Sequence, residues 1–207
     1  MHAFLSSRGT RDLRKKLHTV ANLCRATRED PSFLGMTKMC IIKLTKIQFI
    51  FMTTINLTTK IKASKQIVFD ASRNIDIHQQ SASPTKEKAI AGLTSGLINL
   101  NETVTWRGKH FGFYLTHKSK IPVMNFYDYF VDEMEEGKFK SFRHEHVFEE
   151  ENGVTVMKDI LQYETLFGIF GKLFDILFLE KHLTQFLLER NKILKEVSEE
   201  TKFSFEK

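Results

Sequence analysis

Two histidines and one aspartate lie on neighbouring segments, residues 139–148 and 154–163, whose residue patterns predict β-strands. Because side chains alternate across a strand, His144 and His146 should share one face of the first segment. Asp159 should lie on one face of the second, together with other inward-facing residues. Two histidines at this spacing suit a metal pair or an acid/base pair, and a nearby carboxylate can orient one of them.

The same three residues also have a purely structural interpretation. A histidine–carboxylate pair between adjacent strands is an ordinary way to satisfy buried polar groups. We favour this interpretation over catalysis by His144, His146 and Asp159, because perturbed polar networks do not always mark active sites. No further Cys, His or Glu set completes a coordination shell, so we expect no metal and predict no cofactor. The sequence after residue 52 also contains no phosphate loop, nucleophile elbow or cysteine, which disfavours a covalent mechanism.

Aromatic residues accompany these polar candidates. Trp106 is the only tryptophan and shares a predicted strand face with Val104 and His110. It could stack on a flat ligand, but core packing is the default for any single aromatic residue. The abundance of aromatic residues as a group favours a pocket. The predicted ligand-contacting residues are Trp106, His110, Phe130, Phe142, His144, His146, Phe148, Met157, Asp159, Tyr163 and Phe174.

The net positive charge of the chain comes from its first quarter. Residues 1–52 contain ten Lys and Arg against three acidic residues, a net charge of +7, whereas the remainder contains 21 basic and 22 acidic residues, a net charge of −1. Net charge therefore gives no reason to expect nucleic-acid binding by the larger part. Cys24 and Cys40 also lie in the first quarter, so the remaining 155 residues need no disulfide. A reducing cytoplasm is the simplest setting.

Three interpretations fit residues 1–52. The first 28 residues are basic, as in a transit peptide, but lack an uninterrupted apolar core for secretion. Residues 36–52 are apolar in places, yet three lysines interrupt them, so we predict no transmembrane segment and no stable membrane insertion. We favour a non-native or disordered extension translated upstream of a start at Met52. Residues 53–198 should then form one ligand-binding domain and residues 199–207 a polar tail.

The pattern after residue 52 predicts an α+β domain. We expect a strand over residues 54–61, a short helix from Ser64 to Ala71 and a second strand over residues 74–78. Residues 86–95 are ambiguous between helix and strand. Five further strands should form an antiparallel meander, over residues 100–111, 113–122, 123–134, 139–149 and 154–166.

A long helix is predicted from Gly168 to Val197. Its apolar residues recur at helical spacing and should line one stripe: Phe170, Leu173, Phe174, Leu177, Leu183, Phe186, Leu187, Leu194 and Val197. Such a helix would be about 45 Å long. Because it carries so much apolar surface, a curved sheet must hold it.

The order of these elements resembles the SRPBCC superfamily, whose helix-grip fold wraps a curved antiparallel sheet around a long C-terminal helix. The residues that carry a closer resemblance, to a bacterial subgroup described as cell-division-inhibitor-like or ligand-binding, are Thr103-Val-Thr-Trp106, His110-Phe-Gly112, Phe130-Val-Asp132, Gly137-Lys-Phe139, His144-Glu-His146, Phe148, Thr155-Val-Met157, Asp159, Tyr163, Gly168 and Gly171. The turn before the final helix often carries proline in this subgroup but reads Glu164-Thr-Leu-Phe167 here. The resemblance covers residues 53–198 and implies a hydrophobic cavity for lipids, quinones, hormones or aromatic polyketides, without implying one chemistry.

Three functions remain open from the sequence. The first is a cytoplasmic, non-catalytic protein that binds a small hydrophobic or aromatic molecule between the sheet and the C-terminal helix. The second is a polyketide-cyclase-like cyclase, dehydratase or isomerase that uses the His–Asp group for proton transfer. The third is a regulatory interaction module, which an exposed apolar patch on the helix without a ligand-sized cavity would support. No particular protein partner is predicted.

Overall fold

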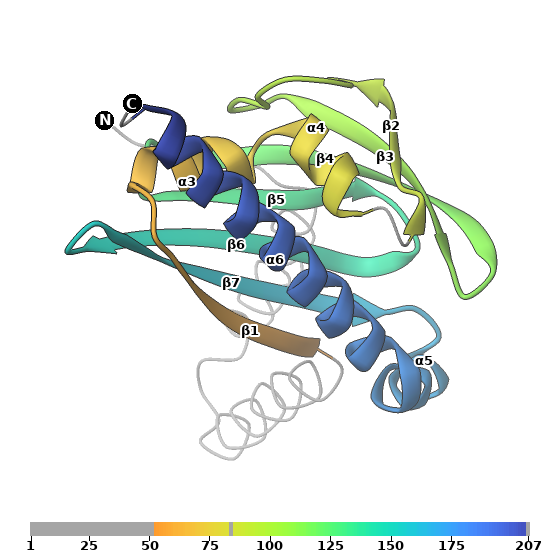
Figure 1. Cartoon of the computed structure of the whole chain (residues 1–207). Coiled ribbons are helices and arrows are strands. Elements are labelled where there is room, and N and C mark those ends of the chain that lie inside the picture. The colour runs from red at the N-terminus through yellow and green to blue at the C-terminus, as the bar shows by residue number, and fades with distance from the viewer. Residues whose placement is uncertain (1–51, 83–84, 206–207) are drawn as a thin grey trace, which may run out of the picture. The chain divides into compact units, whose positions relative to one another are not determined.

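The computed structural model describes residues 52–82 and 85–205. The described residues from Thr53 onward form one compact unit. The predicted extension lies outside the described residues except for Met52, which begins the first strand. The elements of Figure 1 are, in chain order, β1 (Met52–Ile61), α3 (Lys65–Ser72), α4 (Ile75–Ser81), β2 (Lys88–Gly92), β3 (Thr103–His110), β4 (Phe113–Asn125), β5 (Tyr129–Glu136), β6 (Phe139–Glu151), β7 (Val154–Thr165), α5 (Gly168–Phe174), the π-helical segment η2 (Asp175–Leu179) and α6 (Glu180–Phe205).

The seven strands form one sheet in the order β1-β7-β6-β5-β4-β3-β2. Each strand from β2 to β7 pairs antiparallel with the next, so the predicted five-strand meander is confirmed. The first strand of the domain lies beside the last. Figure 1 shows α6 crossing one face of the curved sheet, with α3 beside its C-terminal part. The α+β helix-grip architecture is therefore confirmed.

The register of β6 and β7 places the polar candidates as their alternation predicted. His146 pairs with Asp159 and His144 pairs with Leu161. Every second residue is buried from His144 to Phe148 in β6 and from Thr155 to Tyr163 in β7, including His146, Asp159 and Leu161. The two histidines and the aspartate thus face the helix-covered side of the sheet.

Residues 74–78 do not form the predicted strand. They lie in α4, whose N-cap is Asn74, and the side chain of Asn74 accepts hydrogen bonds from the backbone N–H groups of Asp76 and Ile77. The alternation of Ile75 and Ile77 resembles a strand, but the cap satisfies backbone donors that a strand would pair with a neighbour. By contrast, α3 begins at the expected place, although Ser64 makes no side-chain cap.

Other strand boundaries also differ from the prediction, since β3 begins at Thr103 and β5 at Tyr129. The ambiguous segment 86–95 contains β2, which ends at Gly92. A Cβ atom at Gly92 would lie 2.2 Å from the carbonyl oxygen of Thr103, so this position requires glycine. Strand β4 runs through Pro122 to Asn125 instead of ending at the proline. A shift of register between Lys120 and Val123 accommodates Pro122, which cannot donate a ladder hydrogen bond.

The C-terminal helix also differs from the prediction in two respects. It consists of α5, η2 and α6 in succession and extends to Phe205, past the predicted end at Val197 and into the predicted polar tail. The predicted apolar stripe is buried at Leu183, Leu187 and Leu194. Its first part is exposed instead, at Phe170, Leu173, Phe174 and Leu177. The change in residues per turn at a π-helical segment shifts the stripe relative to an ideal helix.

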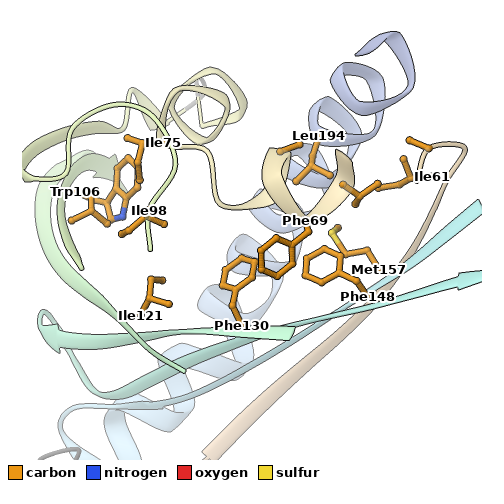
Figure 2. Packing of buried hydrophobic residues seen from close by; sticks show 14 residues of the cluster. Ile61, Phe69, Ile75, Ile98, Trp106, Ile121, Phe130, Phe148, Met157 and Leu194 are labelled. Atoms are coloured by element: carbon orange, nitrogen blue, oxygen red, sulfur yellow. The ribbon is translucent and has the colours of Figure 1, made fainter. Parts of the chain in front are cut away.

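Two groups of apolar side chains make up the core. In the larger group, Phe69 of α3 packs its ring 5.5 Å from that of Phe130 and 5.3 Å from that of Phe148. Figure 2 shows these rings beside Met157 from the sheet and Leu194 from α6. The smaller group joins β1 and β7 to the helix through Ile55, Leu161, Tyr163, Leu179, Leu183 and Leu187.

Candidate functional site: a histidine-lined pocket

A pocket of about 480 Å³ lies among residues of the sheet, α4, α5 and α6. Both core groups contribute apolar side chains to its wall, among them Trp106, Ile121, Phe130 and Leu183. The volume is within the range of small-molecule sites in proteins. Every histidine in the described part of the chain lines this one pocket: His78, His110, His117, His144, His146 and His182.

Three of the predicted polar residues lie together beside this pocket. Nε2 of His144 lies 3.0 Å from Oδ1 of Asp159, within hydrogen-bond distance. Because an ionised carboxylate only accepts hydrogen bonds, Nε2 of His144 carries the shared proton. Nδ1 of His146 lies 2.9 Å from the same oxygen but is not aligned for a hydrogen bond. The ring of His146 stacks on Phe130, with 4.3 Å between ring centroids.

Two residues of α6 complete the surroundings of Asp159. Its Oδ2 accepts a 2.7 Å hydrogen bond from the side-chain amide of Asn191, and Nη1 of Arg190 lies 3.5 Å from its Oδ1. Asp159 is completely buried, so a compensating charge is required. Arg190 supplies this charge. The aspartate therefore joins β7 to α6 as well as to β6.

The protonation states follow from this geometry. Burial by itself would raise the pKa of Asp159, but the hydrogen bond from His144 and the adjacent His146 outweigh it and hold this pKa well below its usual range. Burial, followed by the positive charge of His144, lowers the pKa of His146 to about 3. At neutral pH the cluster thus contains an ionised aspartate and a neutral His146.

The donor set of this cluster is a poor match for a metal ion. One ligand atom from each of His144, His146 and Asp159 can be chosen so that all lie within 4.8 Å of one another. However, the cationic guanidinium of Arg190 lies 3.5 Å from Asp159, and the amide of Asn191 occupies the other carboxylate oxygen. A metal ion would have to displace both groups, so this donor set fits a salt-bridged cluster better than a metal centre.

A second polar group lies on another part of the wall. Nε2 of His78 lies 3.0 Å from Oε2 of Glu87, and the His78 ring stacks on Trp106 with 4.1 Å between centroids. Burial would raise the pKa of Glu87, but the hydrogen bond and charge of His78 reverse this effect and lower it. The indole of Trp106 is thus covered on one face by a histidine whose position a carboxylate fixes.

A third polar group joins the sheet to the beginning of α6. Nδ1 of His110 lies 3.0 Å from Nε2 of His182, so one of these rings donates to the other. The pKa of each is lowered, mainly by burial. Burial also lowers the pKa of His117 on β4. The pocket wall therefore holds several histidines that favour the neutral form and offer both donors and acceptors.

Besides Nδ1 of His146, three polar atoms at the pocket are buried but have no hydrogen-bond partner among the described residues. They are Oγ of Ser119, Oδ1 of Asp132 and Nη1 of Arg190. Such atoms are uncommon in protein interiors, because an unsatisfied buried group costs on the order of 1–3 kcal/mol. A polar group bound in the pocket would satisfy them.

The predicted ligand-contacting residues fall into two sets. Seven line the pocket: Trp106, His110, Phe130, Phe142, His144, His146 and Phe174. Four do not line it: Phe148, Met157, Asp159 and Tyr163. Phe148 and Met157 face the same side of the sheet but pack against Phe69 of α3, which fills the space in front of them. The hydroxyl of Tyr163 donates to Asp175 in η2, and Asp159 is covered by its partners.

Several polar residues of the pocket were not predicted from the sequence, namely His78, Glu87, His117, Ser119, Asp132, His182 and Arg190. His117 and Ser119 occupy alternate positions of a predicted strand, so the period-two pattern could have identified them. Arg190 lies three residues after Leu187 and four before Leu194, so it interrupts the apolar stripe. His78 had no such signal, because its segment was assigned to a strand.

None of the helices in the described part of the chain is long and apolar enough to cross a membrane. No model of a known protein family matches the sequence, and no curated protein matches it. Comparison with solved structures, in contrast, gives many matches.

Three of these structurally similar proteins serve as examples. TTHA0849 from Thermus thermophilus is 17% identical, with a TM-score of 0.59 over 70% of this chain and 97% of that one. Ginseng major latex-like protein 151 from Panax ginseng is 16% identical, with a TM-score of 0.54 over 72% of this chain and 98% of that one. The ZhuI aromatase/cyclase from Streptomyces sp. R1128 is 12% identical, with a TM-score of 0.57 over 72% of this chain and 94% of that one. The resemblance to the SRPBCC superfamily is thus confirmed at the level of the fold, and the chain has the helix-grip fold.

Proposed function

We propose that this protein binds a small hydrophobic or aromatic molecule in the pocket between its sheet and α6. The observation that carries the proposal is the pocket of about 480 Å³, which combines an apolar wall with all the histidines of the described chain. Burial of the ligand's apolar surface would drive binding at about 25 cal/mol per Å². The histidines, together with Ser119 and Arg190, would orient its polar groups.

The comparisons support the same class of ligand. One structurally similar protein is described as an aromatase/cyclase, and another is a di-domain protein described as ARO/CYC from the steffimycin biosynthetic pathway. Their identities to this chain are 12% and 9%, so they suggest a kind of molecule and do not transfer a reaction. An aromatic molecule with several oxygen atoms would match both the apolar wall and the polar atoms of this pocket.

An acid/base enzyme is the second candidate, favoured by the position of His144 and His146 in the pocket wall. The electrostatics oppose the simplest form of that mechanism. A general acid or base works best with a pKa near the working pH, whereas burial lowers the pKa of His146 to about 3. Asp159 is already committed to Arg190 and Asn191. The cluster is therefore better suited to hold a ligand than to move its protons.

The interaction-module alternative predicted an exposed apolar patch without a ligand-sized cavity. The helix does carry exposed apolar residues, among them Phe170 and Leu173. The pocket beside them is nevertheless large enough for a small molecule. Ligand binding is consequently the better proposal.

The first test is native mass spectrometry of the full chain purified from its native host, followed by extraction and identification of any bound molecule. A stoichiometric lipid, quinone or polyketide would support the proposal. A protein that is reproducibly empty, and that a panel of hydrophobic ligands neither stabilises nor shifts, would contradict it.

Two variants test whether the binding site is this pocket. Anilinonaphthalene sulfonate serves as the probe, and energy transfer from Trp106 reports dye that is close to the pocket wall. Ser119→Phe places a ring in the pocket at a residue whose hydroxyl has no partner within the described chain. We expect the dye to bind this variant at least tenfold more weakly, whereas Lys120→Phe, on the next residue of β4, should bind it normally. Equal binding by both variants would place the site elsewhere.

Substitutions in the cluster separate the carrier from the enzyme. If the protein turns over the molecule that copurifies with it, His146→Ala or Asp159→Asn should abolish turnover. If it only carries that molecule, the same changes should reduce affinity and no more, because they remove orienting hydrogen bonds and leave the apolar contacts.

A further inference from the structure

Two neighbouring strands place polar side chains in the sheet wall of the pocket. Ser119 of β4 and Asp132 of β5 both line it, and each has a buried side-chain oxygen without a hydrogen-bond partner among the described residues. Ser119 is only 1% exposed. A wall that only had to cover an apolar molecule would carry apolar side chains at these two positions. Their chemistry is therefore a guide to the ligand.

The strand register brings the two residues close together. Ser119 pairs with Met134, and Asp132 is two residues from Met134 along β5, so Asp132 is a diagonal neighbour of Ser119. Diagonal neighbours on one face of an antiparallel pair lie about 7–8 Å apart at the backbone, and their side chains approach more closely. One group of a ligand can therefore reach both side chains.

Asp132 differs from the other acidic groups at the pocket because it has no partner. Asp159 has Arg190 at 3.5 Å, and Glu87 has His78 at 3.0 Å. Among the described residues, Asp132 has neither an ion pair nor a hydrogen bond. A partly buried carboxylate without a partner opposes folding stability. Its presence in a pocket wall is thus better explained by a ligand than by the fold.

The nearest titratable side chain does not neutralise Asp132. Burial lowers the pKa of His117, and this effect exceeds the opposite influence of Asp132 and Glu87. His117 is therefore neutral at pH 7. Its ring lies 5.1 Å from that of Phe142, between centroids. Asp132 consequently offers its oxygens in a part of the pocket that is lined by uncharged rings.

The two side chains together define the group that fits between them. An ionised carboxylate only accepts hydrogen bonds, whereas a serine hydroxyl both donates and accepts. A ligand group that donates to Asp132 and accepts from Ser119 satisfies both, and a hydroxyl does so with one oxygen atom. A carbonyl or an ether oxygen cannot donate to Asp132. An ammonium group cannot accept from Ser119.

The surrounding side chains favour a hydroxyl on an aromatic ring. The rings of His117 and Phe142 are at 72° to each other, and Phe130 stacks on His146. A flat ring can stack on such side chains or meet them edge to face. A phenol, whose pKa is about 10, is also a better donor to a carboxylate than an alcohol.

We propose that Ser119 and Asp132 form a subsite that selects an aromatic hydroxyl, and that the ligand of this pocket is a phenol. The proposal rests on the proposed function, because it names the ligand class of the same pocket. It also separates the classes that were left open. A quinone offers only acceptors and a fatty acid brings a second negative charge, so both leave Asp132 unsatisfied.

Two matched ligands, 2-naphthol and 2-methoxynaphthalene, test the subsite by isothermal titration of the full-length protein. They share one ring system, and only the naphthol can donate. The ether has more apolar surface, so a pocket without the subsite would bind it more tightly. We expect the naphthol to bind at least tenfold more tightly, because the ether leaves a charged acceptor unpaired. Equal affinities, or a preference for the ether, would overturn the proposal.

Asp132→Leu should remove the selectivity while the pocket remains apolar. The measured quantity is the ratio of the two dissociation constants, which a general change of pocket volume affects little. This ratio should fall at least tenfold in Asp132→Leu and stay unchanged in the control Glu133→Gln, on the next residue of β5, which does not line the pocket. An unchanged ratio in Asp132→Leu would contradict the assignment. Ser119→Ala should weaken naphthol binding about threefold, and unchanged affinity would exclude Ser119 from the subsite.

Thermal unfolding without ligand tests whether Asp132 has a structural role instead. Because its carboxylate has no ion pair or hydrogen bond among the described residues, Asp132→Leu should melt at the wild-type temperature or above it. A melting temperature lowered by about 5 °C or more would show that the carboxylate supports the fold, and would overturn its assignment to the ligand.

The dye assay separates failure of this proposal from failure of the proposed function. If the protein binds the dye near Trp106 and binds both naphthalenes equally, the pocket is a ligand site and the subsite is refuted. If the protein binds neither the dye nor the naphthalenes, the proposed function fails, and the phenol proposal fails with it.

Discussion

Replacing His146 with asparagine should make the protein less sensitive to mild acid. His146 is 2% exposed, and burial together with the charge of His144 lowers its pKa to about 3. In the unfolded chain a histidine titrates near 6.5. Between pH 3 and pH 6.5 this histidine is therefore protonated in the unfolded state but neutral in the folded state. Folding stability therefore falls as the pH decreases from about 6.5 toward 3 and is unaffected by this group above that range.

The size of the effect follows from the separation of the two pKa values. One pKa unit corresponds to about 1.4 kcal/mol, so at pH 5 this histidine should lower the free energy of unfolding by about 2 kcal/mol relative to pH 7. The window from pH 7 to pH 5 is chosen because the pKa values of Asp159 and Glu87 are both lowered by their histidine neighbours. Asp159 and Glu87 therefore lose their contribution to folding stability only at a pH below this window.

Urea unfolding at pH 7 and pH 5 measures this difference for the wild type and for His146→Asn. The loss of stability on acidification should be about 2 kcal/mol smaller in the variant, which is about 1 M in urea midpoint for an m-value near 2 kcal/mol per M. His182→Asn serves as a control and should change the pH dependence less, because His182 is only partly buried. If the variant loses as much stability on acidification as the wild type, the inference that His146 stays neutral in the folded protein is refuted.

Two further substitutions test the packing of the site and of α5. Arg190→Met should reduce the free energy of unfolding by about 3–5 kcal/mol in urea titrations, because it leaves the buried carboxylate of Asp159 without its cation. Adding Asp159→Asn should recover more than half of that loss, and no recovery would show that the arginine acts by packing alone. Gly171→Ala should lower the melting temperature more than Gly108→Ala, because its Cβ would meet a backbone carbonyl at 1.8 Å, compared with a histidine side chain at 3.2 Å for Gly108. Equal shifts in differential scanning fluorimetry would contradict the close approach of α5 to Leu166.

The meander and the inward face of β6 and β7 could be predicted from the sequence. A strand has a side-chain period of two, so the spacing of His144 and His146 was enough to predict that they share one face. The register of β6 and β7 then places Asp159 on the same face. The order of elements was sufficient to predict the helix-grip fold. Local signals failed at residues 74–78, where a side-chain cap at Asn74 overrides the apparent alternation of Ile75 and Ile77.

The composition of the pocket was decided by the tertiary structure. His78, His117 and His182 come from α4, β4 and α6, and no local pattern relates them to the histidines of β6. Likewise, Phe148 has the same alternation as His146, but α3 covers it with Phe69 and removes it from the pocket wall.

The exposure of the apolar segment from Leu166 to Leu179 could not be predicted from the sequence either. Its composition predicts burial, because apolar side chains leave water whenever a surface is available to cover them. In the folded chain Asp175 and Gly171 fix α5 at the end of the sheet, and its phenylalanines remain exposed. Which side chains alternate and which segments are apolar could be predicted from the sequence, because these are local properties. Which of these side chains share a pocket and which face outward depends on what the rest of the chain places in front of them, so it could be seen only in the folded protein.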